Sequence, residues 1–250
     1  MKLTMIDKVA MVTGGSSGIG KATAIEFAKQ GAKVIVAARR EAKGRETVEE
    51  IEALGGQGKF VKADVTQAFE IERLVQQTLE AYGRLDYACN NAGFGKSIPL
   101  LERTESEWDA EIEVNLKAVW LCMKYQIPTM QQTGGGSILN MASMGGGVIG
   151  VPELSSYNAA KAGVVGLTRS ASLEFAQKNI RINSISPGLI STEILSNVAE
   201  ETLNAMVASI PMKRAGEAAE IARAVVWLCS KNASYITGQN LVIDGGFTIQ

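Results

Sequence analysis

A glycine-rich turn between a predicted strand and a predicted helix is the feature that most constrains the fold of this 250-residue chain. Residues 9–12 are apolar, residues 13–20 read Thr-Gly-Gly-Ser-Ser-Gly-Ile-Gly, and residues 19–30 have a helical pattern. Glycines let a backbone approach phosphates closely, and a helix N-terminus offers free N–H groups. A glycine-rich turn is often only a turn, and this spacing is not the common G-x-G-x-x-G. Because a strand and a helix flank it, we interpret it as a dinucleotide pyrophosphate site.

Strand-like and helix-like segments alternate along the rest of the chain. The predicted strands cover residues 8–12, 33–38, 59–63, 85–89, 137–141, 180–186 and 240–243. The predicted helices cover residues 19–30, 40–54, 67–82, 106–131, 155–179, 200–208 and 218–230. This alternation favours a parallel, doubly wound α/β sheet with helices on both faces. No linker or repeat divides residues 1–250, so we expect one domain, with the glycine clusters at 134–136 and 145–147 as loops inside it.

Composition fits an enzyme-sized globular domain and excludes several partners. Hydrophobic residues make up 46% of the chain and charged residues 20%, and the net charge is −1. This balance gives no indication of nucleic acid or an anionic membrane as a partner. Residues 1–7 lack the apolar core of a secretion signal. With three widely spaced cysteines and no histidine, neither a metal site nor a disulfide framework is predicted, and we expect a reducing cytoplasm.

Tyr157 and Lys161 are four residues apart in a segment with a helical pattern, so they share one helical face. A phenol ionises near pH ~10, and a neighbouring positive charge favours the phenolate and lowers its pKa. The chain has no histidine to move protons at neutral pH. The pair therefore indicates acid–base chemistry, although a surface lysine one turn from a packed tyrosine has the same spacing.

Further motifs follow in the order typical of one family. The family pattern T-G-x-x-x-G-x-G is matched by Thr13, Gly14, Gly18 and Gly20, and N-N-A-G by residues 90–93. The catalytic tetrad of that family is matched by Asn115, Ser143, Tyr157 and Lys161, and its P-G turn by Pro187 and Gly188. Over essentially its whole length the chain resembles the classical short-chain dehydrogenase/reductase family. The resemblance implies a Rossmann-type domain whose seven parallel strands have the order 3-2-1-4-5-6-7.

The resemblance implies a role for each member of the tetrad. Tyr157 would exchange a proton with the substrate oxygen, and Lys161 would keep Tyr157 acidic and hydrogen-bond the nicotinamide ribose. Ser143 would donate a hydrogen bond to the substrate oxygen, and Asn115 would hold a water that links Lys161 to solvent. From the residues alone, Ser143 also fits a cap at a strand end, and Asn115 fits a polar interruption of its helix.

The resemblance also implies which residues contact the cofactor. Asp64 would accept a hydrogen bond from the adenine amino group, with Val65 beside the ring, although an aspartate that caps the next helix is an equally good interpretation. The backbone of Ile190 and the hydroxyl of Thr192 would meet the carboxamide. The other implied contacts are Gly14, Ser16, Ser17, Gly18, Ile19, Gly20, Arg39, Arg40, Asn90, Asn91, Ala92, Gly93, Tyr157, Lys161, Pro187 and Gly188.

The end of the second predicted strand indicates which nicotinamide cofactor binds. Proteins of this kind that use NAD carry an acidic residue there, which accepts from the adenosine 2′-hydroxyl. Here Ala38 occupies that position and Arg39 follows. A guanidinium can pair with a 2′-phosphate, so the sequence favours NADP(H) over NAD(H). Two features leave the alternative open: Arg39 and Arg40 also fit the surface start of a helix, and Ser16-Ser17 lacks the second basic residue of many NADP-dependent members.

The substrate pocket is expected between residues 144–154 and residues 189–212. We call residues 189–212 the substrate loop. Its predicted lining is Ser143, Met144, Val148, Ile149, Glu153, Leu154, Tyr157, Leu189, Ile194, Leu195 and Met206. This mostly apolar set predicts a carbonyl reductase or alcohol dehydrogenase that acts on a small ketone or secondary alcohol. A 3-oxoacyl-[acyl-carrier-protein] reductase, a glucose or sugar dehydrogenase and a nucleotide-binding protein without turnover remain as alternatives. Residues 130–136 hold no basic side chain for an acidic carrier, and Lys178 is the obvious basic candidate nearby.

The resemblance implies a homotetramer. The helix predicted over 106–131 carries more apolar side chains than one inward stripe needs, which is compatible with a second buried face. Those side chains are Trp108, Ile112, Leu116, Val119, Trp120, Met123 and Ile127.

Overall fold

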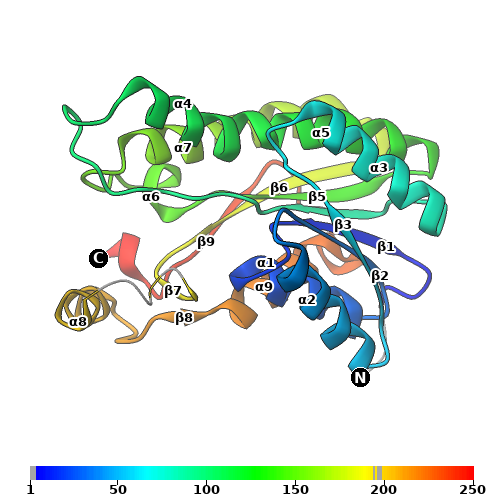
Figure 1. Cartoon of the computed structure of the whole chain (residues 1–250), viewed down its shortest axis with the longest axis horizontal. Coiled ribbons are helices and arrows are strands. Elements are labelled where there is room, and N and C mark those ends of the chain that lie inside the picture. Colours follow the sequence, from blue (N-terminus) through cyan, green and yellow to red (C-terminus); the bar gives the residue numbers. More distant parts are fainter. Residues whose placement is uncertain (1–3, 194, 196–198) are drawn as a thin grey trace.

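Seven parallel strands form the central sheet, in a computed structural model that describes residues 4–193, 195 and 199–250 (Figure 1). They are β1 (Val9–Thr13), β2 (Lys33–Ala38), β3 (Gln57–Lys62), β4 (Tyr87–Asn90), β5 (Gly136–Met141), β6 (Ile180–Pro187) and β9 (Asn240–Ile243). Their order is β3-β2-β1-β4-β5-β6-β9, and every pair is parallel. The predicted fold class and strand order are therefore confirmed.

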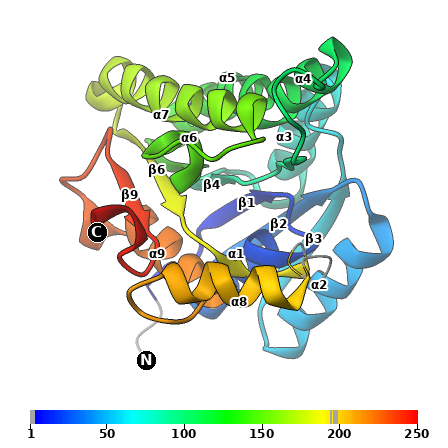
Figure 2. The same cartoon turned by 90° about the vertical axis from the view of Figure 1, so that its left-hand side faces the viewer.

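Helices cover both faces of the sheet. On one face lie α3 (Ala68–Tyr82), α4 (Glu105–Ile112), α5 (Ala118–Gln132) and α7 (Ser155–Phe175), and on the other lie α1 (Gly18–Lys29), α2 (Glu41–Ala53) and α9 (Ala218–Cys229) (Figure 1). The helix α8 (Glu200–Ser209) lies at the end of the molecule that faces the viewer in Figure 2. None of the helices in the described part of the chain has both the length and the apolar character that a bilayer crossing requires.

Side chains of the central strands alternate between two buried cores. Val34 and Val36 of β2 pack in one core with Phe27 of α1. Ile35, between them, packs in the opposite core with Leu74 of α3. Because helices cover both faces, a strand must be apolar on both, which explains the unbroken apolar run in the sequence.

The helix predicted over residues 106–131 is interrupted around Asn115, the member of the predicted tetrad that it carries. Between α4 and α5 the backbone forms a π-helix, η1 (Glu113–Lys117), and Asn115 lies at its centre. The side-chain Nδ2 of Asn115 donates to the carbonyl oxygen of Glu111 at 2.9 Å, four residues earlier. A side chain that takes this carbonyl displaces the backbone N–H that would use it in a regular helix, which favours the wider turn.

Three other segments differ from the predictions. Residues 145–147, predicted as a loop, belong to a short distorted helix, α6 (Met144–Gly147), in which Gly146 has a φ of +84°. The helix predicted over 155–179 ends as α7 at Phe175 and continues as a 3₁₀ turn, Ala176–Lys178. A second sheet, unpredicted, pairs β7 (Ile190–Ser191) with β8 (Gly216–Glu217) and so fixes both ends of the substrate loop.

Candidate active site

The glycine-rich turn joins β1 to α1 at the carboxyl edge of the sheet. Gly14 and Gly18 have φ values of +66° and +52°, in the left-handed region that favours glycine. A Cβ at Gly20 would lie only 2.2 Å from the carbonyl oxygen of Gly14, so a larger residue does not fit. The N-cap residue of α1, Ser17, makes no side-chain hydrogen bond to the first turn. The amides of that turn therefore suit a pyrophosphate.

The N-N-A-G segment after β4 supports the same turn. The Asn91 side chain donates to the carbonyl oxygen of Thr13 at 3.2 Å, and the Thr13 hydroxyl accepts from the backbone N–H of Asn91 at 3.0 Å and of Ala92 at 3.2 Å. Asn90 points elsewhere. Its buried side chain is hydrogen-bonded to Gln126 and Asn140, so only its backbone is left for the implied ribose contact, which stays a prediction.

The two arginines after β2 have different surroundings. Arg40 donates to the Ser17 hydroxyl at 2.6 Å and lies 3.7 Å from the Glu193 carboxylate, so it joins the glycine-rich turn to the substrate loop. The exposed Arg39 side chain makes no hydrogen bond or ion pair with any residue that the structure describes. Ala38 ends β2 beside them. Arg39 is therefore the guanidinium that is available to a phosphate.

Asp64 follows β3 and stabilises its own turn. Its Oδ1 accepts from the backbone N–H and the hydroxyl of Thr66, at 3.0 and 2.9 Å. The next helix, α3, has Gln67 as its N-cap, so the interpretation of Asp64 as the helix cap is wrong. Val65 is buried beside Ile71. A contact of Asp64 and Val65 with adenine stays a prediction.

Three members of the predicted tetrad meet where β5 ends and α7 begins. Lys161 Nζ lies 5.6 Å from the centroid of the Tyr157 ring and donates to the carbonyl oxygen of Met141 at 2.8 Å. Ser143 follows β5, its hydroxyl accepts from the N–H of Gly145 at 3.2 Å, and it lies close enough to Tyr157 to lower the pKa of that phenol. Ser143 is also the N-cap of α6, so its hydroxyl caps a short helix rather than the strand end that the alternative interpretation gave.

Burial dominates the protonation of this pair. Burial raises the pKa of Tyr157 above its ordinary value; the contact with Ser143 lowers it, and the negative charge of Glu111 raises it. Burial also lowers the pKa of Lys161 to about 8. The expectation that Lys161 lowers the pKa of Tyr157 is therefore wrong, because the free-energy cost of burying the phenolate exceeds the stabilisation from the Ser143 contact. Tyr157 is a protonated phenol at neutral pH and can donate its proton.

Asn115, the fourth member, presents a buried acceptor to the same place. Its Nδ2 donates to the carbonyl oxygen of Phe94 at 2.7 Å, whereas its Oδ1 is buried with no partner in the structure. A Cβ at Gly93 would lie 2.5 Å from this Oδ1 and 3.4 Å from Lys161 Nζ, so both atoms border the same space. Buried oxygens without a partner are rare, and this one fits the implied water.

The P-G turn after β6 brings the chain back over the glycine-rich turn. A Cβ at Gly188 would lie 2.7 Å from the Cα of Asp244, so the backbone passes too close for a side chain. Farther on, the methyl group of Thr192 lies 3.3 Å from the position of a Cβ at Gly18. Thr192 and the buried Ile190 are thus near the pyrophosphate turn, as a contact with the carboxamide end of a cofactor requires.

The predicted substrate residues differ in exposure. Met144, Leu189 and Leu195 are half-buried. Glu153 is exposed, its carboxylate accepts from the Ser97 hydroxyl, and its φ of +63° is strained. Ile194 and residues 196–198 of the substrate loop lie outside the described residues.

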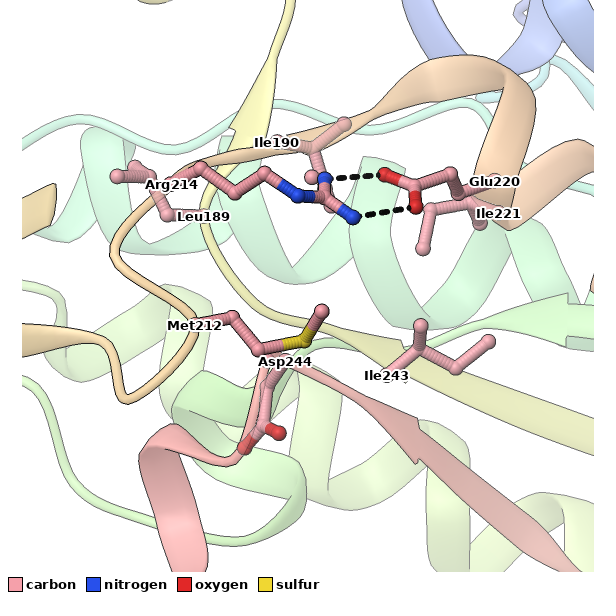
Figure 3. A pocket seen from close by; sticks show the side chains of 10 residues that line it. Leu189, Ile190, Met212, Arg214, Glu220, Ile221, Ile243 and Asp244 are labelled. Atoms are coloured by element: carbon pink, nitrogen blue, oxygen red, sulfur yellow. Dashed lines mark hydrogen bonds and ion pairs between the residues drawn. The ribbon is translucent and has the colours of Figure 1, made fainter.

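Figure 3 shows a cavity of about 90 Å³ beside the substrate loop. Its lining comprises Leu189, Ile190, Met212, Arg214, Gly216, Glu220, Ile221, Ile243, Asp244 and Gly245. Arg214 and Glu220 form a two-point ion pair along one wall, with both nitrogen–oxygen distances 2.7 Å. None of the tetrad lines this cavity, so it is distinct from the space beside Tyr157.

One buried ion pair beside the tetrad is not predicted from the sequence. Arg103 and Glu111 form an ion pair whose side chains are only 2% and 1% exposed, and Glu111 also binds the hydroxyl of Ser156. An acidic residue on a helix and a basic residue in the preceding loop carry no signal of burial, so the sequence offered no means of finding them.

Comparison with known proteins agrees with this arrangement. The sequence profile of the family described as Enoyl-(Acyl carrier protein) reductase matches residues 14–248. A cyclohexanol dehydrogenase of Acinetobacter sp. (strain SE19) is 41% identical, with 97% of this chain and 95% of the relative covered. A 3-oxoacyl-[acyl-carrier-protein] reductase of Thermotoga maritima is 38% identical, with 97% and 98% covered.

A solved short-chain dehydrogenase/reductase from Mycobacterium marinum superimposes with a TM-score of 0.95 at 35% identity, over 99% of this chain and 98% of that one. The chain belongs to the short-chain dehydrogenase/reductase family of oxidoreductases.

Proposed function

We propose that this protein is an NADP(H)-dependent carbonyl reductase or alcohol dehydrogenase that moves hydride between nicotinamide and a ketone or secondary alcohol. The observation that carries the proposal is the meeting of Tyr157, Ser143 and Lys161 at the end of β5, with the glycine-rich turn on the same edge of the sheet. A phenol that is protonated at neutral pH and lies beside a serine hydroxyl is suited to polarise a carbonyl oxygen.

The residues divide the proton chemistry among them. When bound, the nicotinamide cofactor supplies or accepts the hydride. Tyr157 donates its proton to the substrate oxygen in reduction and takes it back in oxidation, a contribution of roughly 10²–10⁴-fold in rate. Ser143 donates a hydrogen bond to that oxygen. Lys161, with a pKa of about 8, and the free Oδ1 of Asn115 pass the replacement proton inward through a water.

The cofactor would be held by residues on the carboxyl edge of the sheet. The amides at Gly18, Ile19 and Gly20 would bind the pyrophosphate, and Asp64 and Val65 the adenine. Arg39 would pair with the 2′-phosphate, and its lack of a partner among the described residues supports NADP(H) over NAD(H). Lys161 would bind the ribose, beside Ala92 and Gly93. Ile190 and Thr192 would meet the carboxamide.

The substrate is proposed to be a mostly apolar ketone or alcohol. The similarity to a cyclohexanol dehydrogenase and the apolar side chains of Met144, Leu189 and Leu195 support this class. A 3-oxoacyl-[acyl-carrier-protein] reductase is the second candidate, because a relative of similar identity bears that name. The last turn of α5 has no basic residue, which weakens attraction of an acidic carrier protein.

The test is cofactor consumption across a substrate panel. NADPH and NADH are each offered with apolar cyclic ketones, aldoses and β-ketoacyl thioesters. We expect NADPH and the ketones to give the highest kcat/KM. Preference for a thioester would transfer the proposal to the acyl-carrier reductase, and retained NADPH binding without turnover of any substrate would favour a non-catalytic binder. A homotetrameric assembly and a cytoplasmic location stay predictions.

A further inference from the structure

The buried ion pair of Arg103 and Glu111 lies directly behind the catalytic residues. Arg103 Nη1 lies 3.3 Å from Glu111 Oε1, and both side chains are almost completely inaccessible to solvent. Glu111 Oε1 also accepts from the backbone N–H of Lys96 at 2.8 Å, and Oε2 accepts from the Ser156 hydroxyl at 2.6 Å. Buried pairs of this kind often stabilise a protein no more than apolar side chains of the same size would. Stability alone therefore does not explain this pair.

Glu111 contacts supports of two catalytic residues. Ser156, which its carboxylate binds, immediately precedes Tyr157 in the first turn of α7. The backbone carbonyl oxygen of Glu111 accepts from Nδ2 of Asn115, whose Oδ1 borders the same space as Lys161 Nζ. One residue of α4 thus holds the amide of one tetrad member and the helix turn of another, and α4 and α7 pack against each other (Figure 1).

The same pair holds the wall that faces the Tyr157 ring. Lys96, bound by Glu111, follows Gly95, and a Cβ at Gly95 would lie 2.9 Å from the Tyr157 ring. Arg103 donates to the carbonyl oxygens of Lys96 at 2.8 Å and of Glu153 at 3.0 Å. The ring is therefore bordered by backbone whose position the ion pair fixes.

We propose that Glu111, paired with Arg103, is a positioning residue of the active site, which holds Tyr157 through Ser156 and Gly95 and holds Asn115 through its own carbonyl oxygen. The inference rests on the proposed catalytic role of Tyr157. The charged and polar groups that face Tyr157 are Lys161 on its own helix, Glu111 on α4 with its partner Arg103, and Ser143 after β5.

Two variants separate positioning from simple stability. Glu111→Gln keeps the shape of the side chain and removes its charge. The double variant Arg103→Met/Glu111→Met replaces the pair by apolar side chains of similar length, which restores packing without a buried charge. Asp109→Asn, an exposed acid on the same helix, is the matched control.

We expect the double variant to melt near the wild-type temperature while kcat falls at least ~10-fold, because small misplacement of reacting groups is costly. KM for NADPH should hardly change. In alcohol oxidation, the rise of activity with pH should shift to lower pH in both variants, most in Glu111→Gln, because a negative charge near the Tyr157 phenolate has been removed. Asp109→Asn should behave as wild type in every measurement.

Wild-type kcat with an unmoved pH profile in the folded double variant would overturn the proposal, whatever happens to the stability of Glu111→Gln. Tyr157→Phe is measured in parallel. If Tyr157→Phe is inactive while the double variant is fully active, only the positioning role is wrong. If Tyr157→Phe keeps wild-type activity, the proposed function fails and the positioning role fails with it.

Discussion

Lys161 holds its ammonium 5.6 Å from the centroid of the Tyr157 ring and donates to the carbonyl oxygen of Met141 at 2.8 Å. That hydrogen bond ties α7 to the end of β5, so the ammonium position is set by the sheet rather than by Tyr157. The lysine is thereby fixed beside the space that Gly93 and Asn115 border. Burial lowers its pKa to about 8. The fixed position of Lys161 beside Tyr157 and its lowered pKa underlie the first three predictions.

Tyr157→Phe should abolish most activity without unfolding the protein. The substitution keeps the ring and removes the phenolic proton that Tyr157 would exchange with the substrate, so kcat should fall by at least ~10². Affinity for NADPH, measured by fluorescence titration, should stay close to that of the unmodified protein. A variant that still turns over at the original rate would remove Tyr157 from the mechanism.

Ketone reduction and alcohol oxidation should depend on pH in opposite ways. Reduction needs the protonated phenol, and burial keeps the pKa of Tyr157 above its ordinary value. The lower of the two pKa values is that of Lys161, about 8, so kcat/KM for reduction should be flat below about pH 8. Oxidation needs a base at Tyr157, so its rate should rise with pH. Initial rates in both directions, in buffers of constant ionic strength, test this. Oxidation that slows as pH rises would contradict it.

Lys161→Met should stabilise the protein while it destroys activity. The folded protein holds the Lys161 proton with a pKa of about 8, against an ordinary 10.5, so ionised Lys161 costs stability. The full cost applies below about pH 8 and disappears as pH rises toward 10.5. Removing it should add roughly 2–3 kcal/mol at neutral pH, after about 1 kcal/mol is lost with the Met141 hydrogen bond.

Chemical denaturation at pH 7 and again near pH 10 checks this prediction. The gain over wild type should shrink at the higher pH, because the unmodified lysine is then largely neutral. An equal gain at both values would mean that better packing of methionine, and not the buried charge, explains the effect.

Arg39→Ala should reduce the preference for NADPH over NADH. One charge-assisted contact to a 2′-phosphate is worth roughly 1.5–3 kcal/mol, or about one to two decades in kcat/KM. Ala38→Asp should act in the same direction by repelling the phosphate. Lys43→Ala, which removes an exposed cation farther along α2, serves as the control. Equal kinetics of the unmodified enzyme with both cofactors would refute the assignment of Arg39.

Leu173→Glu should dissociate the expected tetramer and lower activity together. Leu173, near the end of α7, is 81% exposed, and Trp120, near the start of α5, is 46% exposed. Tyr157 and Lys161 lie toward the other end of α7, and Asn115 lies in the π-helix that precedes α5. An unpaired carboxylate in an apolar interface is costly. Light scattering at micromolar concentration measures the assembly, with Leu54→Glu, just after α2, as a matched exposed site. A fully active monomer before any substitution would show that these faces do not pair.

The sequence by itself determined the fold class, and its motifs gave the resemblance from which the strand order and the candidate tetrad were predicted. Alternating apolar segments have few ways to bury both faces, which favours a parallel sheet between two layers of helices. The strand order came from the resemblance to a known family. The separation of Tyr157 and Lys161 by four residues placed them on one helical face without any tertiary information. Ala38 and Arg39 likewise indicated a cofactor from their place at a strand end.

Only the tertiary structure decided the environment of those residues. Burial depends on what packs from other elements, so the upward direction of the Tyr157 pKa was opposite to that expected from its neighbour along the helix. The π-helix at Asn115 and the partners of Arg40 required contacts that local pattern does not encode. Arg103 and Glu111 look like ordinary surface charges in the sequence. They become a buried pair because α4, α7 and the loop that joins β4 to α4 cover both side chains. The spacing of residues in the sequence does not indicate this burial.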